Sequence, residues 1–140
     1  MFTKVLLAYD GSEGANRALE AGIELAKIHR AELWAVAVEE KLPRFSGTID
    51  EVREAKEFAN QHYGKLLETA RTRAKEAGVD LKTLLRPGHP AQTIVQVAKD
   101  GKFDLVLVGH SGLSGVWAAF LGTTAEKVSR HARCSVLIVR

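Results

Sequence analysis

Four residues near the C-terminal end, Gly109, Gly112, Gly122 and Thr123, have the types and spacing of a phosphate-binding turn. An aliphatic stretch at 105–108 leads into the first glycine, and a helix-like stretch follows Thr123. When a strand ends in glycines and a helix begins nearby, backbone N–H groups stay unpaired and the helix dipole favours an anion beside them. Glycine also lets the main chain approach phosphate oxygens, because no Cβ intervenes. The pattern therefore predicts a turn that holds phosphate.

Two plainer interpretations of these residues stay open. Glycines occur at turns in any α/β protein, so their presence alone requires no ligand. Thr123 and Glu126 also have the spacing of a capping box, in which the threonine hydroxyl closes the start of a helix. Both roles are compatible if the hydroxyl is shared with a phosphate oxygen.

The elements that must position this turn alternate between strand and helix. Strand-like apolar stretches are expected at 4–9, 33–38, 81–85, 103–108 and 135–139. Helical spacing is found at 12–29, 48–78, 91–98 and 124–132. Strict alternation implies parallel strands with right-handed crossovers, and so an α/β fold that is a three-layer sandwich around a five-stranded parallel sheet. The expected strand order is 3-2-1-4-5, which is flavodoxin-like or Rossmann-like, in one domain spanning 1–140.

In that strand order the first and fourth strands are neighbours, and ligands of open parallel sheets bind at the carboxyl ends of the strands. Asp10, Gly11 and Ser12 follow the first strand, whereas the glycine turn follows the fourth. We therefore expect these two distant segments to meet across one crevice. Ser12 is the expected N-cap of the first helix.

The second helix is expected to be long, with one apolar stripe. Thr48 and Glu51 have the spacing of a capping box, and Gly78 is the expected stop. The stripe consists of Val52, Ala55, Ala59, Tyr63, Leu66, Ala70, Ala74 and Ala77. The preceding stretch 39–46 contains a proline and follows neither period, so we expect a loop there.

Composition excludes several classes of function. The net charge is +3, and no run of like charge or interleaved aromatic patch favours nucleic acid. The single cysteine, Cys134, excludes an internal disulfide, and the scattered histidines leave no metal site built on His and Cys. The stretch 5–9 is too short for an export signal or a membrane span, so we expect a cytoplasmic protein with no membrane contact.

The whole chain resembles the universal stress protein (UspA) family, in its nucleotide-binding subgroup. That subgroup carries G-x-x-G, nine residues and G-(S/T), and the four residues of the turn match every fixed position. Further matches lie in the turn at 88–91, the fourth strand and the closing strand. Ser135 departs from the pattern, because a proline is usual there, but it lies away from the expected site.

The resemblance implies a ligand, ATP with Mg²⁺ or Mn²⁺, and a role for each matching residue. Gly112, Gly122 and Thr123 would hold the phosphates, and Gly109 would lie on the ribose side. Asp10 would contact the ribose or the divalent ion. An alternative for Asp10 stays open, because aspartate between a strand and a helix is a common helix cap. The adenine would be read by the main chain of the second strand, at the position matched by Ala37.

The expected function is an ATP-binding universal stress protein, a nucleotide-responsive regulator in the stress response. We expect hydrolysis to be slow at most, because no G-x-x-x-x-G-K-(S/T) motif supplies a lysine to the transferring phosphate. One competing interpretation is an ATPase or adenylating enzyme, although positions 10–13 lack the Ser-Gly-Gly loop of such enzymes. The other is a partner-binding module that has lost its nucleotide, with protein partners that the sequence does not identify.

A homodimer is the expected assembly. The stretch 113–121 is apolar for a loop, and the closing strand at 136–139 carries no charge or proline to protect an edge. Association through that edge strand and the apolar stretch would cover both. The alternative for 113–121 is one amphipathic turn packed on its own core.

Overall fold

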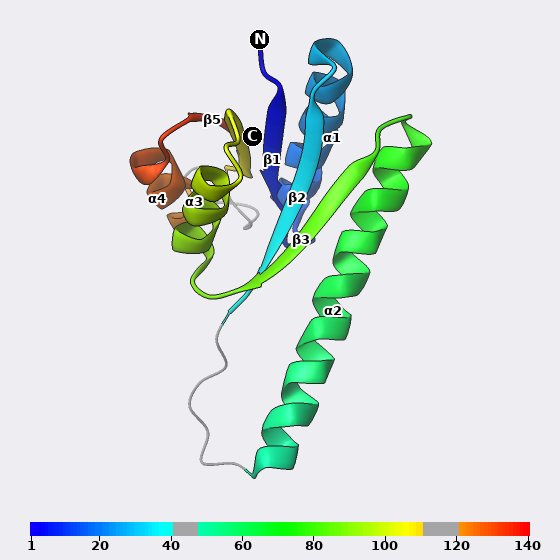
Figure 1. Cartoon of the computed structure of the whole chain (residues 1–140), viewed down its shortest axis with the longest axis vertical. Coiled ribbons are helices and arrows are strands. Elements are labelled where there is room, and N and C mark those ends of the chain that lie inside the picture. The colour runs from blue at the N-terminus through cyan, green and yellow to red at the C-terminus, as the bar shows by residue number, and fades with distance from the viewer. Residues whose placement is uncertain (41–47, 111–120) are drawn as a thin grey trace.

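The computed structural model describes residues 1–40, 48–110 and 121–140 of the chain, and Figure 1 shows their arrangement. The order of elements is β1 (Lys4–Ala8), α1 (Glu13–His29), β2 (Glu32–Glu39), α2 (Ile49–Glu76), β3 (Leu81–Pro87), α3 (Pro90–Asp100), β4 (Leu105–Gly109), α4 (Thr123–His131) and β5 (Ser135–Val139). All strand pairs are parallel, and the sheet order is β3-β2-β1-β4-β5. The predicted fold class and strand order are confirmed.

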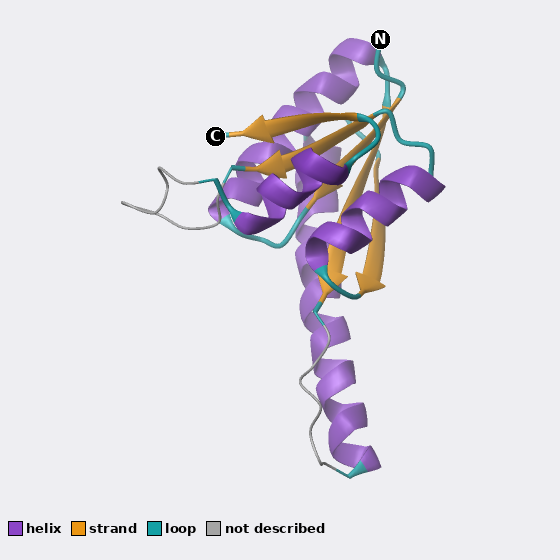
Figure 2. Cartoon of the chain, turned by 90° about the vertical axis from the view of Figure 1, so that its left-hand side faces the viewer, coloured by secondary structure: helices purple, strands orange, loops and turns teal. Residues whose placement is uncertain are grey.

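Helices cover the sheet on both faces, which gives three layers (Figures 1 and 2). Side chains of a strand alternate between the faces, so Val5 and Leu7 of β1 pack with α1 and α2, whereas Leu6 packs with α3 and α4. All three are completely buried. Because the central strands are covered on both sides, they are apolar at almost every position, as a parallel sheet requires.

Helix α2 begins with the predicted capping box. The Thr48 hydroxyl accepts a hydrogen bond from the Glu51 N–H at 3.2 Å, and the Glu51 carboxylate accepts one from the Thr48 N–H. Of the predicted stripe, only Ala70 and Ala74 in the C-terminal half are fully buried; the buried leucine of this half is Leu67, and the predicted Leu66 is half-buried. The N-terminal half extends past the end of the sheet (Figure 1), where Val52 remains 49% exposed.

Some strand boundaries differ from the prediction. β4 begins at Leu105 and not at 103, because the N–H of Phe103 donates its hydrogen bond to the carbonyl of Ala98 at the end of α3. Phe103 is nevertheless buried and lies edge-on to Trp34, with ring centroids 6.0 Å apart. β2 and β3 are longer than expected, because their pairing continues to Glu39 and Pro87.

Two predictions fall partly outside the described residues. Most of the expected loop at 39–46 and nearly all of the apolar stretch at 113–121 belong to the segments 41–47 and 111–120. Among the described helices, none is both long enough and apolar enough to cross a membrane. Cys134 is half-buried beside β5, and burial raises the pKa of its thiol.

Candidate functional site

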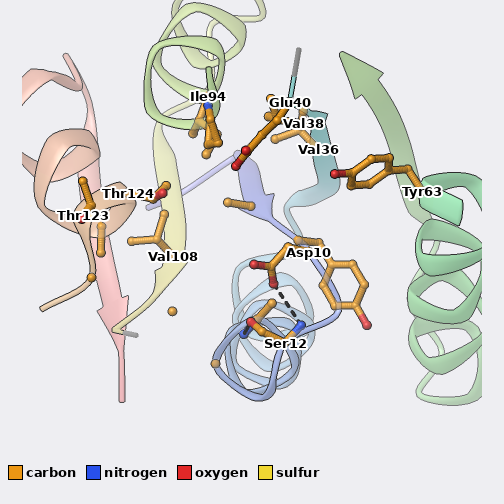
Figure 3. Close-up of a pocket in the computed structure, with 18 of the residues that line it drawn as sticks. Asp10, Ser12, Val36, Val38, Glu40, Tyr63, Ile94, Val108, Thr123 and Thr124 are labelled. Carbon is orange, nitrogen blue, oxygen red and sulfur yellow. Dashed lines mark hydrogen bonds between the residues drawn. The ribbon is translucent and has the colours of Figure 1, made fainter. Parts of the chain in front are cut away.

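A cavity of about 570 Å³ lies at the carboxyl ends of β1, β2 and β4, between α1, α2 and α4 (Figure 3). We call it the edge cavity. Its lining is contributed by Ala8, Tyr9, Asp10, Ser12, Gly14, Ala15, Val36, Val38, Glu40, His62, Tyr63, Pro90, Ile94, Val108, Gly109, Leu121, Gly122, Thr123, Thr124 and Ala125. The predicted meeting of the segments after β1 and β4 is therefore confirmed, and the position is the one where parallel sheets bind ligands.

At the start of α1, on one side of the edge cavity, nearby side chains accept hydrogen bonds from the backbone N–H groups. Ser12 is the N-cap, and its hydroxyl accepts a hydrogen bond from the Ala15 N–H at 3.2 Å. The Asp10 carboxylate accepts one from the Ser12 N–H at 2.9 Å, as Figure 3 shows. Ser12 is thus confirmed as the cap. The alternative that Asp10 itself caps the helix is wrong, because Asp10 holds the turn that precedes the cap.

The start of α4, on the other side, receives no side-chain cap from its N-cap residue. Gly122 is the N-cap residue, and Thr123 is already the first residue of the helix. The Glu126 N–H bonds to the carbonyl of Gly122 at 2.9 Å, so the alternative capping box of Thr123 and Glu126 is wrong. Its pattern is present, but the helix begins one residue too early for the threonine to act as the cap. The first-turn N–H groups of α4 therefore lack a capping hydroxyl or carboxylate from Gly122.

Gly109 ends β4 and lines the edge cavity. A Cβ at this position would lie 2.7 Å from the carbonyl carbon of Gly14, which belongs to the first turn of α1. Glycine is required here because the backbones of β4 and α1 approach each other closely. Gly109, Gly122 and Thr123 are brought together at the cavity, whereas Gly112 lies outside the described residues.

Ala37 does not line the edge cavity. Its side chain is completely buried on the opposite face of the sheet, in the core under α1 and α2. Val36 and Val38, its neighbours in β2, do line the cavity. The prediction that the main chain at Ala37 reads a base is not tested by this placement, since it concerns backbone atoms.

The hydrogen bonds of β2 show which of its peptide groups face the edge cavity. The Val36 carbonyl accepts the Tyr9 N–H, and the Glu39 carbonyl accepts the Gly88 N–H beyond β3, both at 2.9 Å. Successive residues of a strand direct their peptide groups to opposite sides. Val38 therefore directs its peptide groups as Val36 does, and β1 has already ended at Ala8 at that level. Sequence reasoning missed Val38, because the period of two along β2 does not show where the neighbouring β1 ends.

Sequence reasoning also missed four polar residues that line the edge cavity, namely Tyr9, Glu40, His62 and Tyr63. The Tyr9 hydroxyl donates to the side-chain Oδ1 of Asn16 at 2.6 Å, and burial, with the neighbouring charge of Asp10, raises the pKa of Tyr9. Figure 3 shows Glu40 and Tyr63 at the cavity from β2 and α2. Tyr9 and Glu40 come directly after β1 and β2, so their place at the carboxyl edge of the sheet was a signal for them, whereas the place of His62 and Tyr63 depends on how α2 packs.

The edge cavity combines an apolar wall with a polar one. Val36, Val38 and Ile94 form apolar surface that suits a planar ring, while the start of α4 offers N–H groups to an anion. The carboxylates of Asp10 and Glu40 are the kind of oxygen ligand that Mg²⁺ and Mn²⁺ prefer. Within the described lining there is no lysine or arginine.

The fold and the site define a class of protein: doubly wound parallel α/β domains that bind a ligand at the carboxyl edge of the sheet. The sequence profile of the universal stress protein family matches residues 1–140, and the chain belongs to that family. Universal stress protein YxiE of Bacillus subtilis is 38% identical over 151 aligned positions that cover all of both chains.

Two solved structures show the same fold. The universal stress protein UspA from Lactobacillus plantarum has a TM-score of 0.88 at 26% identity, covering 99% of this chain and 98% of its own. A universal stress protein in complex with cAMP has a TM-score of 0.74 at 27% identity, covering 99% and 97%. The family predicted from the glycine motif is confirmed.

Proposed function

We propose that this universal stress protein binds an adenine nucleotide, ATP with Mg²⁺ or Mn²⁺, in the edge cavity and acts as a nucleotide-responsive regulator of the stress response. The observation that carries the proposal is the start of α4 at Gly122, an N-cap residue without a capping side chain, which opens onto the same cavity as the apolar wall of Val36 and Ile94. The similar universal stress protein in complex with cAMP supports an adenine nucleotide as the ligand class.

Each part of such a ligand has a proposed partner. The phosphates lie at the start of α4, at Gly122 and Thr123, with Gly112, and Gly109 lies beside the ribose. The Gly122 N–H already donates to the His110 carbonyl at 2.8 Å, so the N–H groups proposed for the phosphates begin at Thr123. A β-carbon added at Gly122 would stand where the phosphate chain reaches the helix. Asp10 keeps one carboxylate oxygen outside its bond to Ser12, which can accept a ribose hydroxyl or coordinate the divalent ion.

The main chain of β2 is the proposed reader of the adenine. Ala37 was the predicted position, and the direction of the peptide groups favours Val38 as the residue that supplies the hydrogen bonds. Backbone recognition would tolerate different side chains along this part of β2. The base itself would lie against Val36, Val38 and Ile94.

The proposed role is regulatory binding with slow hydrolysis at most. N–H groups and a divalent ion suffice for affinity, but faster chemistry requires charge that binds the transition state more strongly than the ground state. The described lining offers no lysine or arginine for that purpose. Multiple-turnover hydrolysis at about one per second, within the usual range for enzymes, would contradict this role.

Nucleotide binding is tested directly on the purified protein. Mass spectrometry of protein prepared without added nucleotide should detect a co-purifying adenine nucleotide, and calorimetric titration with Mg-ATP should give saturable heat. If no nucleotide co-purifies and titration gives neither heat nor a shift in Tm, the protein is instead the partner-binding module that the sequence left open.

A homodimer through β5 is the proposed assembly, in the cytoplasm and without nucleic acid. β5 is the edge strand next to β4, and Leu137 at its centre is 39% exposed. An uncharged edge can pair with the same edge of a second copy. Leu137→Glu should convert the dimer to a monomer in light scattering coupled to size exclusion. A wild-type monomer would contradict the proposal.

A further inference from the structure

A second hollow, of about 910 Å³, lies between α3 and α4. We call it the interhelical groove. Its lining consists of Glu40, His89, Pro90, Ala91, Gln92, Val95, Gln96, Thr123, Thr124, Glu126, Lys127, Arg130 and His131. The proposed mononucleotide site touches the groove only where the two hollows join, although the groove is the larger of the two.

The groove and the edge cavity meet at four shared residues. Glu40, Pro90, Thr123 and Thr124 line both. Pro90 begins α3 and Thr123 begins α4, and neither helix has a hydrogen bond from a side chain of its N-cap residue. The junction is therefore bordered by two helix starts whose dipoles favour negative charge, on the side where the phosphates of a nucleotide are proposed to lie. The Glu40 carboxylate at the same junction opposes phosphate unless a divalent ion lies between them.

The lining of the groove suits a neutral polar group. Lys127 and Arg130 are balanced in formal charge by Glu40 and Glu126, and Arg130 is paired with Glu126 at 2.9 Å. Gln92 offers an amide that can donate and accept hydrogen bonds at once. The same lining also contains the imidazole rings of His89 and His131 and the apolar Val95.

This balance decides among possible occupants. An acidic peptide needs an excess of cations along its length, which the described lining does not provide, and a free phosphate at the junction would leave the groove unfilled. A nucleoside needs an apolar surface for its ring and mixed donors and acceptors for its edge and its sugar. The groove offers both, next to a junction that favours phosphate.

We propose that the protein binds dinucleoside polyphosphates, with one adenosine in the edge cavity, the phosphate chain at the junction and the second nucleoside in the interhelical groove. The proposal rests on the proposed nucleotide function, because the first adenosine uses that site. It extends the ligand class from mononucleotides to nucleotides whose last phosphate carries a second nucleoside.

Diadenosine tetraphosphate and ATP are the probes, titrated calorimetrically into the full chain with Mg²⁺. The two ligands carry the same formal charge near neutral pH, so a difference in affinity reports the second adenosine. We expect diadenosine tetraphosphate to bind at least about tenfold more tightly than ATP, since it buries an additional base and sugar. Equal affinities, with ATP still binding, would overturn this inference and leave the proposed function intact.

Gln92→Trp should fill the groove and remove the tenfold advantage while leaving the affinity for ATP unchanged. Gln61→Trp is the matched control, because Gln61 is exposed on α2 and lines neither hollow. If Gln92→Trp does not fold, the variant Gln92→Ala with Gln96→Ala should reduce the advantage instead. An advantage that survives in every folded groove variant would overturn the inference, whereas a failure of ATP itself to bind would overturn the proposed function as well.

Discussion

Helices α1 and α4 begin at the same edge of the sheet and border the same cavity. They differ in whether the N-cap residue supplies a side-chain acceptor for the N–H groups of the first turn. In α1, Ser12 caps the helix and Asp10 holds the turn before it, so the protein supplies its own acceptors. In α4, Gly122 has no side chain to offer. Two helix starts of similar geometry thus differ in what they leave for a ligand.

The two helix starts also differ in the charge that faces the edge cavity. Asp10 places a carboxylate beside α1, where it repels phosphate and attracts a cation. On the cavity side, the start of α4 offers N–H groups and the hydroxyls of Thr123 and Thr124, which favour an anion, while the first-turn residue Glu126 lines the interhelical groove and pairs with Arg130. A ligand with phosphate at one end and a bound cation between the two helices would satisfy both sides.

The largest effect on nucleotide affinity is expected when the N-cap residue of α4, like that of α1, carries a side chain. Gly122→Val should weaken binding of Mg-ATP at least about a hundredfold, or about 2.7 kcal/mol, because the side chain occupies the space of a phosphate oxygen. The backbone at Gly122, with φ −62° and ψ 152°, accepts valine, so the fold should persist. Titration calorimetry measures the loss.

The matched control is Gly64→Val, at an exposed position on α2 where an added side chain meets no atom within 4 Å. Its affinity should equal that of the wild type. An unchanged affinity in Gly122→Val would mean that α4 does not hold the phosphate.

The contact that places α1 beside the cavity is the next target. Gly109→Ala should lower the free energy of unfolding by about 2 kcal/mol, because the new methyl group collides with the Gly14 backbone. Denaturant unfolding measures this change. Stability equal to the wild type would show that α1 can shift without cost, and the close approach would then not explain the glycine.

Removing only the charge of Asp10 sharpens the contrast between the two helix starts. Asp10→Asn keeps an oxygen for the Ser12 N–H, so Tm should stay close to that of the wild type. The affinity for Mg-ATP should fall about tenfold if the carboxylate coordinates the ion. Titrations with Mg²⁺ and with a chelator measure the effect. A lower Tm with unchanged affinity would assign Asp10 to the turn alone.

The mildest change removes the cap of α1. Ser12→Ala should lower the free energy of unfolding by about 1 kcal/mol, since the Ala15 N–H loses its acceptor. The affinity for Mg-ATP should change by less than about threefold, because α1 is not the proposed phosphate site. Thermal unfolding and titration of one sample test both. A larger loss of affinity than of stability would move the phosphate toward α1.

The strand order and the meeting of the two turns could be predicted because a buried parallel strand is apolar almost throughout. The start of α4 could not, since Thr123 and Glu126 satisfy a capping pattern that the helix does not use. The choice between Ala37 and Val38 required knowing where β1 ends relative to β2. Tyr63 was predicted as part of an apolar stripe, and only the packing of α2 places it at the cavity.

Helix α2 is continuous from Ile49 to Glu76, but different interactions stabilise its two halves. Beyond the sheet, where Phe58 is 73% exposed, helical order depends on the cap at Thr48 and on intrinsic propensity. Next to the sheet, the order depends on burial of Leu67 and Ala70. Local opening should therefore begin at Ile49 and stop near Tyr63, so the same residue that borders the cavity marks the limit of fraying.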